Sequence, residues 1–505
     1  MRSVEILDTT LRDGEQTSGV AFSAPEKLSI ARKLLEEVKV DRIEVASARV
    51  SAGEMECVKA VCAWAAEAGL LERVEVLGFC DDGKSIEWIR ESGARVINLL
   101  TKGSEKHCRG QLGKEPEEHF ADVARNIRMA REAGLSVNLY LEDWSNGIKE
   151  GADYVFAMVD ALQSEDICRI MLPDTLGVLS PRETRRFVKA MVEHYRHLRF
   201  DYHAHNDYDL AVANVLAAVE EGCSGVHCTV NGLGERAGNA SLASVVAVIN
   251  DMTEARVRVE EKSINSVSRM VESYSGMALA ANQPIVGENV FTQTAGVHAD
   301  GDKKAGLYVN RLLPERFGRS REYALGKMSG KANIEQNLRL LGISLSEEDM
   351  KKVTRRINEL GDKKEKVSID DLPFIISDVL HHGTANERIK LVSYMVSTAY
   401  GLHPQAVVKL EVNGKQYEES ATGDGQYDAF VRAVRHIYRD ALGRTFPWLS
   451  NYQVTIPPGG RTDALVQTAI SWQYEGKTYR TRGLDADQTE AAIKATIKML
   501  NLLEE

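Results

Sequence analysis

The chain has 505 residues, of which 43% are hydrophobic and 27% are charged, and its formal net charge is −11. This length predicts two or three domains, and the composition is that of an ordinary globular protein. The negative charge argues against a nucleic-acid partner. The sequence contains no run of about 18 apolar residues that would predict a membrane span. The first residues show no signal-peptide pattern. The seven cysteines form no CxxC pair, which is typical of free thiols in a reducing cytoplasm.

Eight short β-rich segments alternate with amphipathic helical patterns in the first half of the chain. Proline or serine opens several of the helical patterns and glycine closes several. The alternation predicts a (β/α)8 TIM barrel over residues 1–270. A doubly wound sheet is the alternative, but it normally carries a Gly-rich phosphate loop after its first strand, and LRDGEQ has one glycine. The expected strands are residues 4–10, 42–47, 73–79, 95–101, 136–143, 168–175, 199–205 and 225–232.

Active sites of TIM barrels lie at the C-terminal ends of the strands, where polar residues gather in this sequence. His203 and His205 alternate in FDYHAH, so both side chains face the same side of the seventh strand. Asp13, after the first strand, supplies a carboxylate that could complete a site for Zn²⁺, Mn²⁺, Fe²⁺ or Mg²⁺. Asn239 is a further candidate ligand, although its position after Gly238 fits a turn residue equally well. Outside a barrel, the two histidines would be interpreted as surface residues of an edge strand.

Three further side chains at the strand ends suit chemistry beside a carbonyl group. Arg12 could stabilise an alkoxide or enolate as it forms, and a salt bridge to Glu44 is an alternative that is compatible with this role. Glu142 is a candidate general base. Thr175 is a candidate hydrogen-bond donor to a substrate carboxylate. Together with a metal ion, these residues predict carbon–carbon bond chemistry.

Four segments carry a resemblance to a known family: LDTTLRDGEQ (7–16), HAHND (203–207), NGLGERAGN (231–239) and FTQTAGVHADG (291–301). They resemble the DRE-TIM metallolyases, and more narrowly the acyl-CoA-condensing branch of isopropylmalate, homocitrate and citramalate synthases. The resemblance covers essentially the whole chain. It implies condensation of acetyl-CoA with a 2-oxo acid and hydrolysis of the thioester. Matching positions imply Asp13, His203 and His205 as metal ligands, Arg12 at the alkoxide, Thr175 at the substrate carboxylate and Glu142 in base catalysis.

The same resemblance implies an active homodimer. His298, beyond the barrel, is expected to reach the active site of the other subunit, accompanied by Tyr308. A lyase of the same superfamily is a rival interpretation, but such lyases carry a cysteine in the loop after the eighth strand, and NGLGERAGN has none. A non-catalytic amino-acid sensor is a second rival, but it would be expected to lose the three metal ligands, and all three are present.

Tyr140, two residues before Glu142, bears on the identity of the oxo acid. Isopropylmalate synthases tend to carry a small residue at this position. With Leu77 and Leu100, Tyr140 would form a small apolar pocket that admits a methyl group and excludes an isopropyl group, although Leu77 is equally consistent with an ordinary barrel-interior residue. Longer matches, such as YLEDWSNG, look closest to bacterial citramalate synthases. The expected substrate is pyruvate, and a 2-isopropylmalate synthase is the alternative.

The remaining chain is expected to contain two further parts. Residues 271–387 are expected to hold a flexible segment and a helical linker subdomain, with a helix over 346–362. From residue 388, strand-like patterns precede a helix twice. VNGKQYEESATGDGQYDAFVRAV and YEGKTYRTRGLDADQTEAAIKAT align at a period of about 62 residues, which predicts two related units in a C-terminal α+β domain.

Residues 388–505 show no catalytic set, so a binding role is favoured. The resemblance implies an allosteric domain whose effector, in the citramalate branch, is isoleucine, the distant end product. Leucine remains the alternative. Core packing is a strong alternative for Leu449, Ile456 and Val466, and helix capping for Asp428. The positions expected to line the effector pocket are Tyr427, Asp428, Leu449, Tyr452, Ile456 and Val466.

Overall fold

The computed structural model describes residues 2–293, 310–325, 329–340, 343–362, 388–455, 466–485 and 487–504, and also 367, 372, 375, 376 and 379. The chain forms two compact units, Met1–Thr292 with Gly306–Glu322 and Gln293–Ala305 with Tyr323–Glu505. The three-part division expected from the sequence remains a prediction. Helix α11 (Ile264–Ser275) runs through the first expected domain border, between residues 270 and 271.

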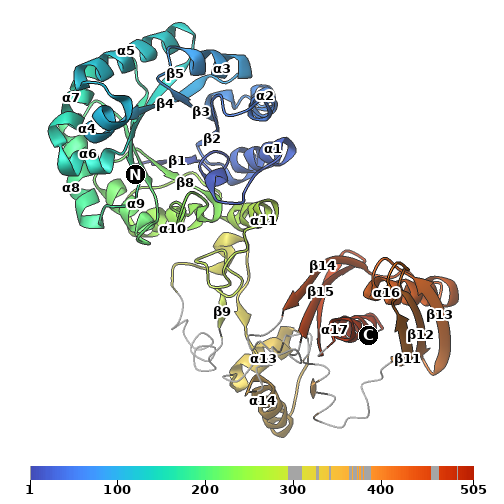
Figure 1. Ribbon diagram of the computed structural model, residues 1–505. Helices are drawn as coiled ribbons and strands as arrows, with labels where there is room; N and C mark the ends of the chain where they lie inside the picture. Colours follow the sequence, from blue (N-terminus) through green and yellow to red (C-terminus); the bar gives the residue numbers. More distant parts are fainter. Residues whose placement is uncertain are drawn as a thin grey trace. The chain divides into compact units, whose positions relative to one another are not determined.

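Eight parallel strands form a closed barrel in the first unit, and β8 pairs back with β1 (Figure 1). The predicted TIM barrel is therefore confirmed. Each strand lies within its expected segment, except that β4 runs one residue further. The strands are β1 (Glu5–Asp8), β2 (Arg42–Ser47), β3 (Val74–Phe79), β4 (Val96–Lys102), β5 (Ser136–Glu142), β6 (Arg169–Asp174), β7 (Phe200–Ala204) and β8 (Gly225–Cys228).

Helices surround the barrel and begin where the sequence carries capping residues. In α8 (Pro181–His194), Pro181 occupies the first turn, the Glu183 amide donates to the Ser180 hydroxyl at 3.3 Å, and the Glu183 carboxylate accepts from the Ser180 amide at 3.0 Å. The other helices of this unit are α1 (Ala24–Arg32), α2 (Ala52–Glu67), α3 (Lys84–Ser92), α4 (Glu105–His107), α5 (Pro116–Glu132), α6 (Trp144–Glu150), α7 (Ala152–Leu162), α9 (Ala211–Glu220) and α10 (Leu242–Met252).

A buried ion-pair network closes the N-terminal end of the barrel. Asp201 accepts from Arg42 at 2.5 Å and from Arg169 at 3.0 Å, and Arg42 and Arg169 also pair with Glu75 and Glu5 at 2.8 and 2.9 Å. Burial alone would raise the pKa of Asp201, but the two arginines hold it well below its ordinary value. The network therefore forms a charged floor, a buried layer of ion pairs at the end of the barrel opposite the predicted site.

The second unit contains a helical pair and a C-terminal α+β domain. Helices α13 (Lys331–Leu340) and α14 (Glu347–Asp362) pack through a small core that includes Ile334, Val353 and Ile357. The helix expected over 346–362 is thus found.

The C-terminal domain repeats one βββα unit, as its sequence period predicts. Each unit has a three-stranded antiparallel sheet followed by a helix, and both units contribute to one hydrophobic core (Figure 1). The first unit comprises β11 (Ile389–Ser397), β12 (Gln405–Val412), β13 (Lys415–Thr422) and α16 (Gln426–His436). The second comprises β14 (Trp448–Thr455), β15 (Val466–Tyr474), β16 (Lys477–Asp485) and α17 (Gln488–Leu502).

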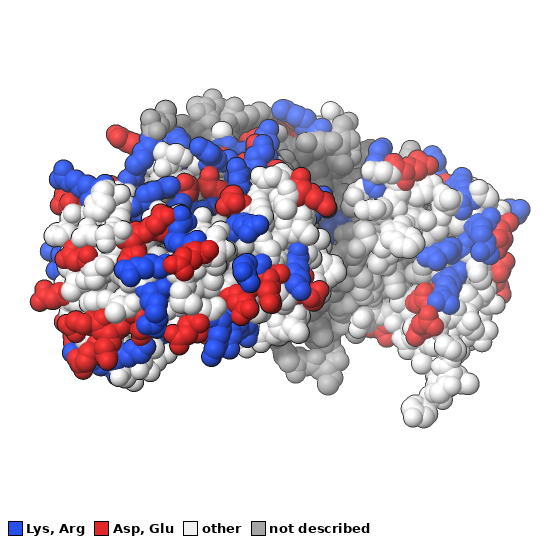
Figure 2. Space-filling model, turned by 90° about the horizontal axis from the view of Figure 1, so that it is seen from above, with Lys and Arg blue, Asp and Glu red and all other residues white. Residues whose placement is uncertain are grey.

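The surface charges fit the overall composition. On the face shown in Figure 2, basic and acidic side chains are interleaved rather than gathered by sign. Among the helices of the described residues, none is long and apolar enough to cross a membrane.

The charged floor yields a stability prediction. Asp201→Asn should destabilise the barrel by about 3–5 kcal/mol, because it leaves Arg42 and Arg169 buried with a lost partner charge. Glu67→Gln, at an exposed position of α2, should change stability by less than about 0.5 kcal/mol. Hydrogen exchange of peptides covering β2 and β6, followed across a urea series, measures both. Equal protection in the two variants would show that the network does not stabilise the barrel.

Candidate active site

Three side chains from two strand ends form a group that could hold a metal ion. Asp13 follows β1, and His203 and His205 lie on and just after β7. One ligand atom from each lies within 4.8 Å of the others, and all three residues are buried. The Nε2 atoms of His203 and His205 are 3.3 and 3.9 Å from Asp13 Oδ2. Because β8 alone separates β7 from β1 in the barrel, residues almost 200 positions apart meet at one mouth.

The hydrogen bonding of this group leaves acceptors that suit a cation. Neither carboxylate oxygen of Asp13 has a hydrogen-bond partner, and Asn239 Oδ1 is also buried without one. The Asn239 Nδ2 donates to the Leu233 carbonyl at 3.0 Å, which leaves Oδ1 as the available atom. A Cβ at Gly234 would lie 2.2 Å from Asn239 Nδ2, so the loop needs glycine there for Asn239 to adopt this position. Buried oxygens without partners and neutral imidazoles suit a divalent metal ion.

The histidines are set in their neutral form. Burial, with His205, His227 and Arg12 nearby, lowers the pKa of His203 well below its ordinary value. Burial also lowers the pKa of His205, against the opposing effect of Asp13. A neutral imidazole keeps a lone pair for a metal ion.

Arg12 lies at the end of a polar chain through the barrel interior. Its Nε donates to Glu44 at 2.5 Å, and Glu44 accepts from Asn98 at 2.7 Å. Asn98 in turn accepts from Asn138 at 2.8 Å. Burial opposes the charge of Arg12, but Glu44 and Asp13 raise its pKa above the ordinary value. The predicted salt bridge to Glu44 is present, and Arg12 Nη2 has no hydrogen-bond partner.

The predicted pocket residues come together in the barrel interior. Tyr140, Leu77 and Leu100 pack in one apolar cluster, which also contains Leu7 and Met171. The Tyr140 ring lies 5.8 Å from that of His203 and 5.9 Å from that of His227, centroid to centroid. The Arg12 guanidinium acts against burial on the pKa of the Tyr140 hydroxyl, so the two groups interact electrostatically. Tyr140 is therefore a polar neighbour of Arg12 as well as an apolar wall.

Glu142 and Thr175 lie at neighbouring strand ends. Glu142 forms an ion pair with Lys102, the last residue of β4. The Thr175 hydroxyl accepts a hydrogen bond from the Asp143 amide at 3.0 Å, so its own hydrogen remains available to donate. His298 and Tyr308 lie outside the described residues, and their roles remain predictions.

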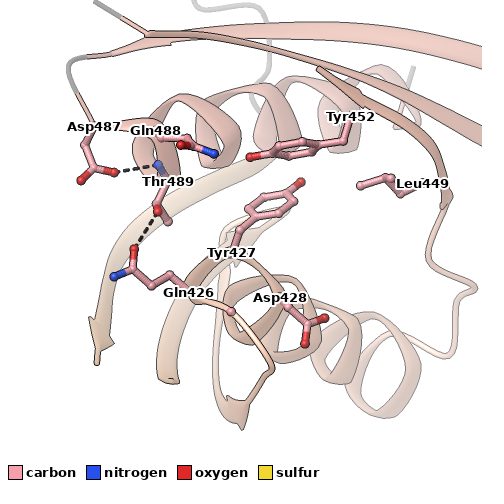
Figure 3. Close-up of a pocket in the computed structure, with 9 residues that line it drawn as sticks. Gln426, Tyr427, Asp428, Leu449, Tyr452, Asp487, Gln488 and Thr489 are labelled. Carbon is pink, nitrogen blue, oxygen red and sulfur yellow. Dashed lines mark hydrogen bonds between the residues drawn. The ribbon is translucent and has the colours of Figure 1, made fainter. Parts of the chain in front are cut away.

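Four of the six predicted effector residues line one cavity of about 600 Å³ in the C-terminal domain (Figure 3). Figure 3 shows the rings of Tyr427 and Tyr452 facing each other. Their centroids are 5.4 Å apart. Val466 begins β15 and is not among the nine described residues that line the cavity, and Ile456 lies outside the described residues. The lining residues are Gly425, Gln426, Tyr427, Asp428, Leu449, Tyr452, Asp487, Gln488 and Thr489.

Several site residues escaped the sequence analysis. Lys102 directly follows the expected fourth strand, so its position at the mouth was predictable from the same rule that selected Glu142. His227 alternates into the interior of β8 and contacts the His203 ring at 5.4 Å. In the cavity of the C-terminal domain, Gln426 accepts from Thr489 at 2.9 Å and thereby joins the two repeat units (Figure 3). The sequence period could have indicated this junction, because Gln426 and Gln488 are equivalent at the offset of 62.

Comparisons with known families define the class of protein. The HMGL-like model matches residues 3–271, the homocitrate synthase post-HMGL domain-like model matches 285–365, and the LeuA allosteric (dimerisation) domain model matches 366–504. Together they describe a DRE-TIM barrel enzyme with a C-terminal domain of the LeuA type.

Relatives over the full length narrow the class. The chain is 35% identical to a probable 2-isopropylmalate synthase of Methanopyrus kandleri, covering 99% of this chain and 98% of the relative. It is 33% identical to the (R)-citramalate synthase CimA of Methanocaldococcus jannaschii, covering 99% of each. A 2-isopropylmalate synthase of the same organism is 32% identical, covering 99% and 94%. The chain therefore belongs to the acyl-CoA-condensing branch of the DRE-TIM metallolyases, which are transferases.

The group formed by Asp13, His203 and His205 leads to a prediction about metal binding. His203→Gln should lower the affinity for Zn²⁺ or Mn²⁺ by more than the roughly 10- to 100-fold typical of an outer-shell change, because it removes a ligand atom. His227→Gln is the matched control, since His227 is equally buried in the same barrel and lies outside the ligand group. Equilibrium dialysis with elemental analysis measures both. Equal loss in the two variants would contradict this ligand set.

Proposed function

We propose that the chain is a citramalate synthase, which condenses acetyl-CoA with pyruvate and hydrolyses the thioester to release citramalate and CoA. The observation that carries this proposal is the position of Tyr140. Tyr140 fills the barrel interior beside Asp13, His203 and His205 and packs with Leu77 and Leu100. Relatives named for both activities match the chain almost equally well, so the argument depends on the site.

The metal group and its neighbours suit a 2-oxo acid. Asp13, His203 and His205 would hold a divalent ion, with Asn239 as a further oxygen ligand. When bound, such an ion supplies Lewis-acid polarisation of a carbonyl group. The unpartnered Nη2 of Arg12 would donate to the oxo oxygen as negative charge develops there. Thr175, whose hydrogen remains available, would donate to the substrate carboxylate.

Glu142 is the proposed general base. Its carboxylate would accept a proton from the methyl carbon of acetyl-CoA, and the C–H electron pair would become the enolate that attacks the 2-oxo carbon. Water then adds to the thioester carbonyl, and the thiol of CoA leaves. His298 and Tyr308, proposed to come from the other subunit, would complete the site.

The apolar wall supports pyruvate as the oxo acid. Tyr140 is 5% exposed, Leu77 5% and Met171 0%, so the space beside them is already filled by side chains. Tyr140 is packed against the rings of His203 and His227, which restricts its rotation away from a larger substrate. A methyl group is therefore favoured over an isopropyl group.

The cavity in the C-terminal domain is the proposed site of an amino-acid effector. Leu449 and the rings of Tyr427 and Tyr452 offer apolar contact, and Asp428 offers a carboxylate for an α-ammonium group. With a pathway that starts from pyruvate, the proposed effector is isoleucine. The match to a LeuA allosteric (dimerisation) domain supports a homodimer.

Substrate selectivity tests the proposed activity. Wild-type enzyme should turn over pyruvate with a higher kcat/KM than 2-oxoisovalerate, and Tyr140→Ala should shift the ratio toward 2-oxoisovalerate by about 10- to 200-fold, because it removes the wall. A CoA-release assay with a panel of 2-oxo acids, run with and without chelator, measures this. A wild-type preference for 2-oxoisovalerate would make the 2-isopropylmalate synthase alternative correct.

Effector binding is tested separately from turnover. Asp428→Asn should raise the isoleucine concentration needed for half-inhibition by about 10- to 150-fold, the value of a lost charge-assisted hydrogen bond, and leave kcat without effector unchanged. Asp440→Asn, an exposed carboxylate after the same helix, is the matched control. Isothermal calorimetry with isoleucine and leucine identifies the ligand. Inhibition unchanged in Asp428→Asn would exclude this cavity.

A further inference from the structure

Lys102 forms the closest ionic contact of the proposed base. Lys102 ends β4, Glu142 ends β5, and the two residues pair directly in the parallel register. The Lys102 ammonium forms an ion pair with the Glu142 carboxylate, and the side chains are 11% and 26% exposed. A charge pair this far withdrawn from water is screened less than a surface pair, so it constrains the carboxylate more strongly.

The main chain of Lys102 is itself fixed on both sides. Its N–H donates to His119 Nε2 at 3.3 Å, and its carbonyl accepts from the Tyr154 hydroxyl at 3.0 Å. Burial, aided by Lys114, lowers the pKa of His119 to about 4, so the ring is neutral at physiological pH and can accept. The next amide, Gly103 N–H, donates to the Glu142 carbonyl at 2.6 Å. The side chain that carries the ammonium group therefore extends from a backbone that is anchored to both α5 and α7.

Glycine at position 103 is required for this arrangement. A Cβ at Gly103 would lie 2.6 Å from the Leu141 carbonyl oxygen, and one at Gly147 would lie 2.1 Å from the Gly103 carbonyl oxygen. The end of β4 thus packs against β5 and α6 without space for adjustment. Without the ammonium, the Glu142 side chain would be free to change rotamer at the mouth.

We propose that Lys102 is a positioning residue for the condensation, holding the Glu142 carboxylate aimed at the acetyl methyl group. The inference rests on the proposed function, because it requires Glu142 to be the base. In the step, the methyl proton moves to a Glu142 oxygen and the C–H electron pair becomes the enolate. Lys102 keeps its own proton throughout. A purely structural role for the pair is the alternative.

The test uses the full-length, metal-loaded enzyme with Lys102→Met, Lys102→Arg, Glu142→Gln and the Lys102→Met/Glu142→Gln double variant. Lys149→Met is the matched control, because Lys149 pairs with Glu183 at 3.1 Å in the same barrel. The readouts are kcat, KM for pyruvate, and exchange of the acetyl-CoA methyl protons with deuterated water. Melting temperature and metal content show whether each variant is folded and loaded.

Lys102→Met should lower kcat and methyl exchange by about 100-fold, as expected for a misplaced catalytic group, with KM for pyruvate changed less than about threefold. Lys102→Arg should restore most of the loss, and Lys149→Met should show none. In the Glu142→Gln background, Lys102→Met should have no further effect, because the two residues act as a unit.

Three results would overturn the inference without refuting the proposed base. One is unchanged methyl exchange in Lys102→Met while Glu142→Gln abolishes it, which would leave the proposed base intact. Another is a double variant in which the fold loss of kcat from Lys102→Met multiplies the fold loss from Glu142→Gln. A third is a loss of metal content or melting temperature in Lys102→Met that accounts for the whole effect and that Lys102→Arg does not restore. Full exchange in Glu142→Gln would instead refute the proposed base, and the inference with it.

Discussion

The mouth of the barrel depends on the ion pair between Arg12 and Glu44. Glu44 is fully buried and the Arg12 side chain is 9% exposed, and a single unpaired charge in such a place costs several kcal/mol. Arg12 donates a charge-paired hydrogen bond to the Glu44 carboxylate, and Glu44 also accepts a hydrogen bond from Asn98. This fixes Arg12 beside Asp13 and Tyr140, so the guanidinium that we propose meets the developing charge and the proposed pocket wall share one support. Beneath it, Asp201 with Arg42 and Arg169 supports the interior in the same way.

The sequence predicts the parts of this arrangement that follow from periodicity. The alternation of strands and helices predicts the barrel, and the spacing of His203 and His205 places both on one face. The closed strand order then brings Asp13 beside them. Contacts between residues on different strands are harder to predict from the sequence, because they depend on the register of the strands. The pairing of Lys102 with Glu142 follows from the alignment of β4 with β5, which hydrophobic patterns do not specify.

The repeat in the C-terminal domain shows a second limit of sequence reasoning. Asp428 and Glu490 are equivalent at the offset of 62, but their environments differ. Asp428 lines the cavity and pairs with Arg432 at 2.8 Å, whereas Glu490 accepts from the Tyr394 hydroxyl. The sequence period predicts two equivalent helix starts. It does not predict that a tyrosine from β11 engages one of the two carboxylates.

Selectivity and activation are joined at Tyr140. An apolar wall could be replaced by any residue of similar volume, because it acts through shape alone. The Arg12 guanidinium also acts on the Tyr140 hydroxyl, but burial raises the pKa of that hydroxyl well above the ordinary value, so the phenol keeps its proton. A change at Tyr140 is therefore expected to alter both the space proposed for the oxo acid and the environment of the guanidinium. Discrimination between oxo acids by this wall is consequently expected to appear in kcat as well as in KM.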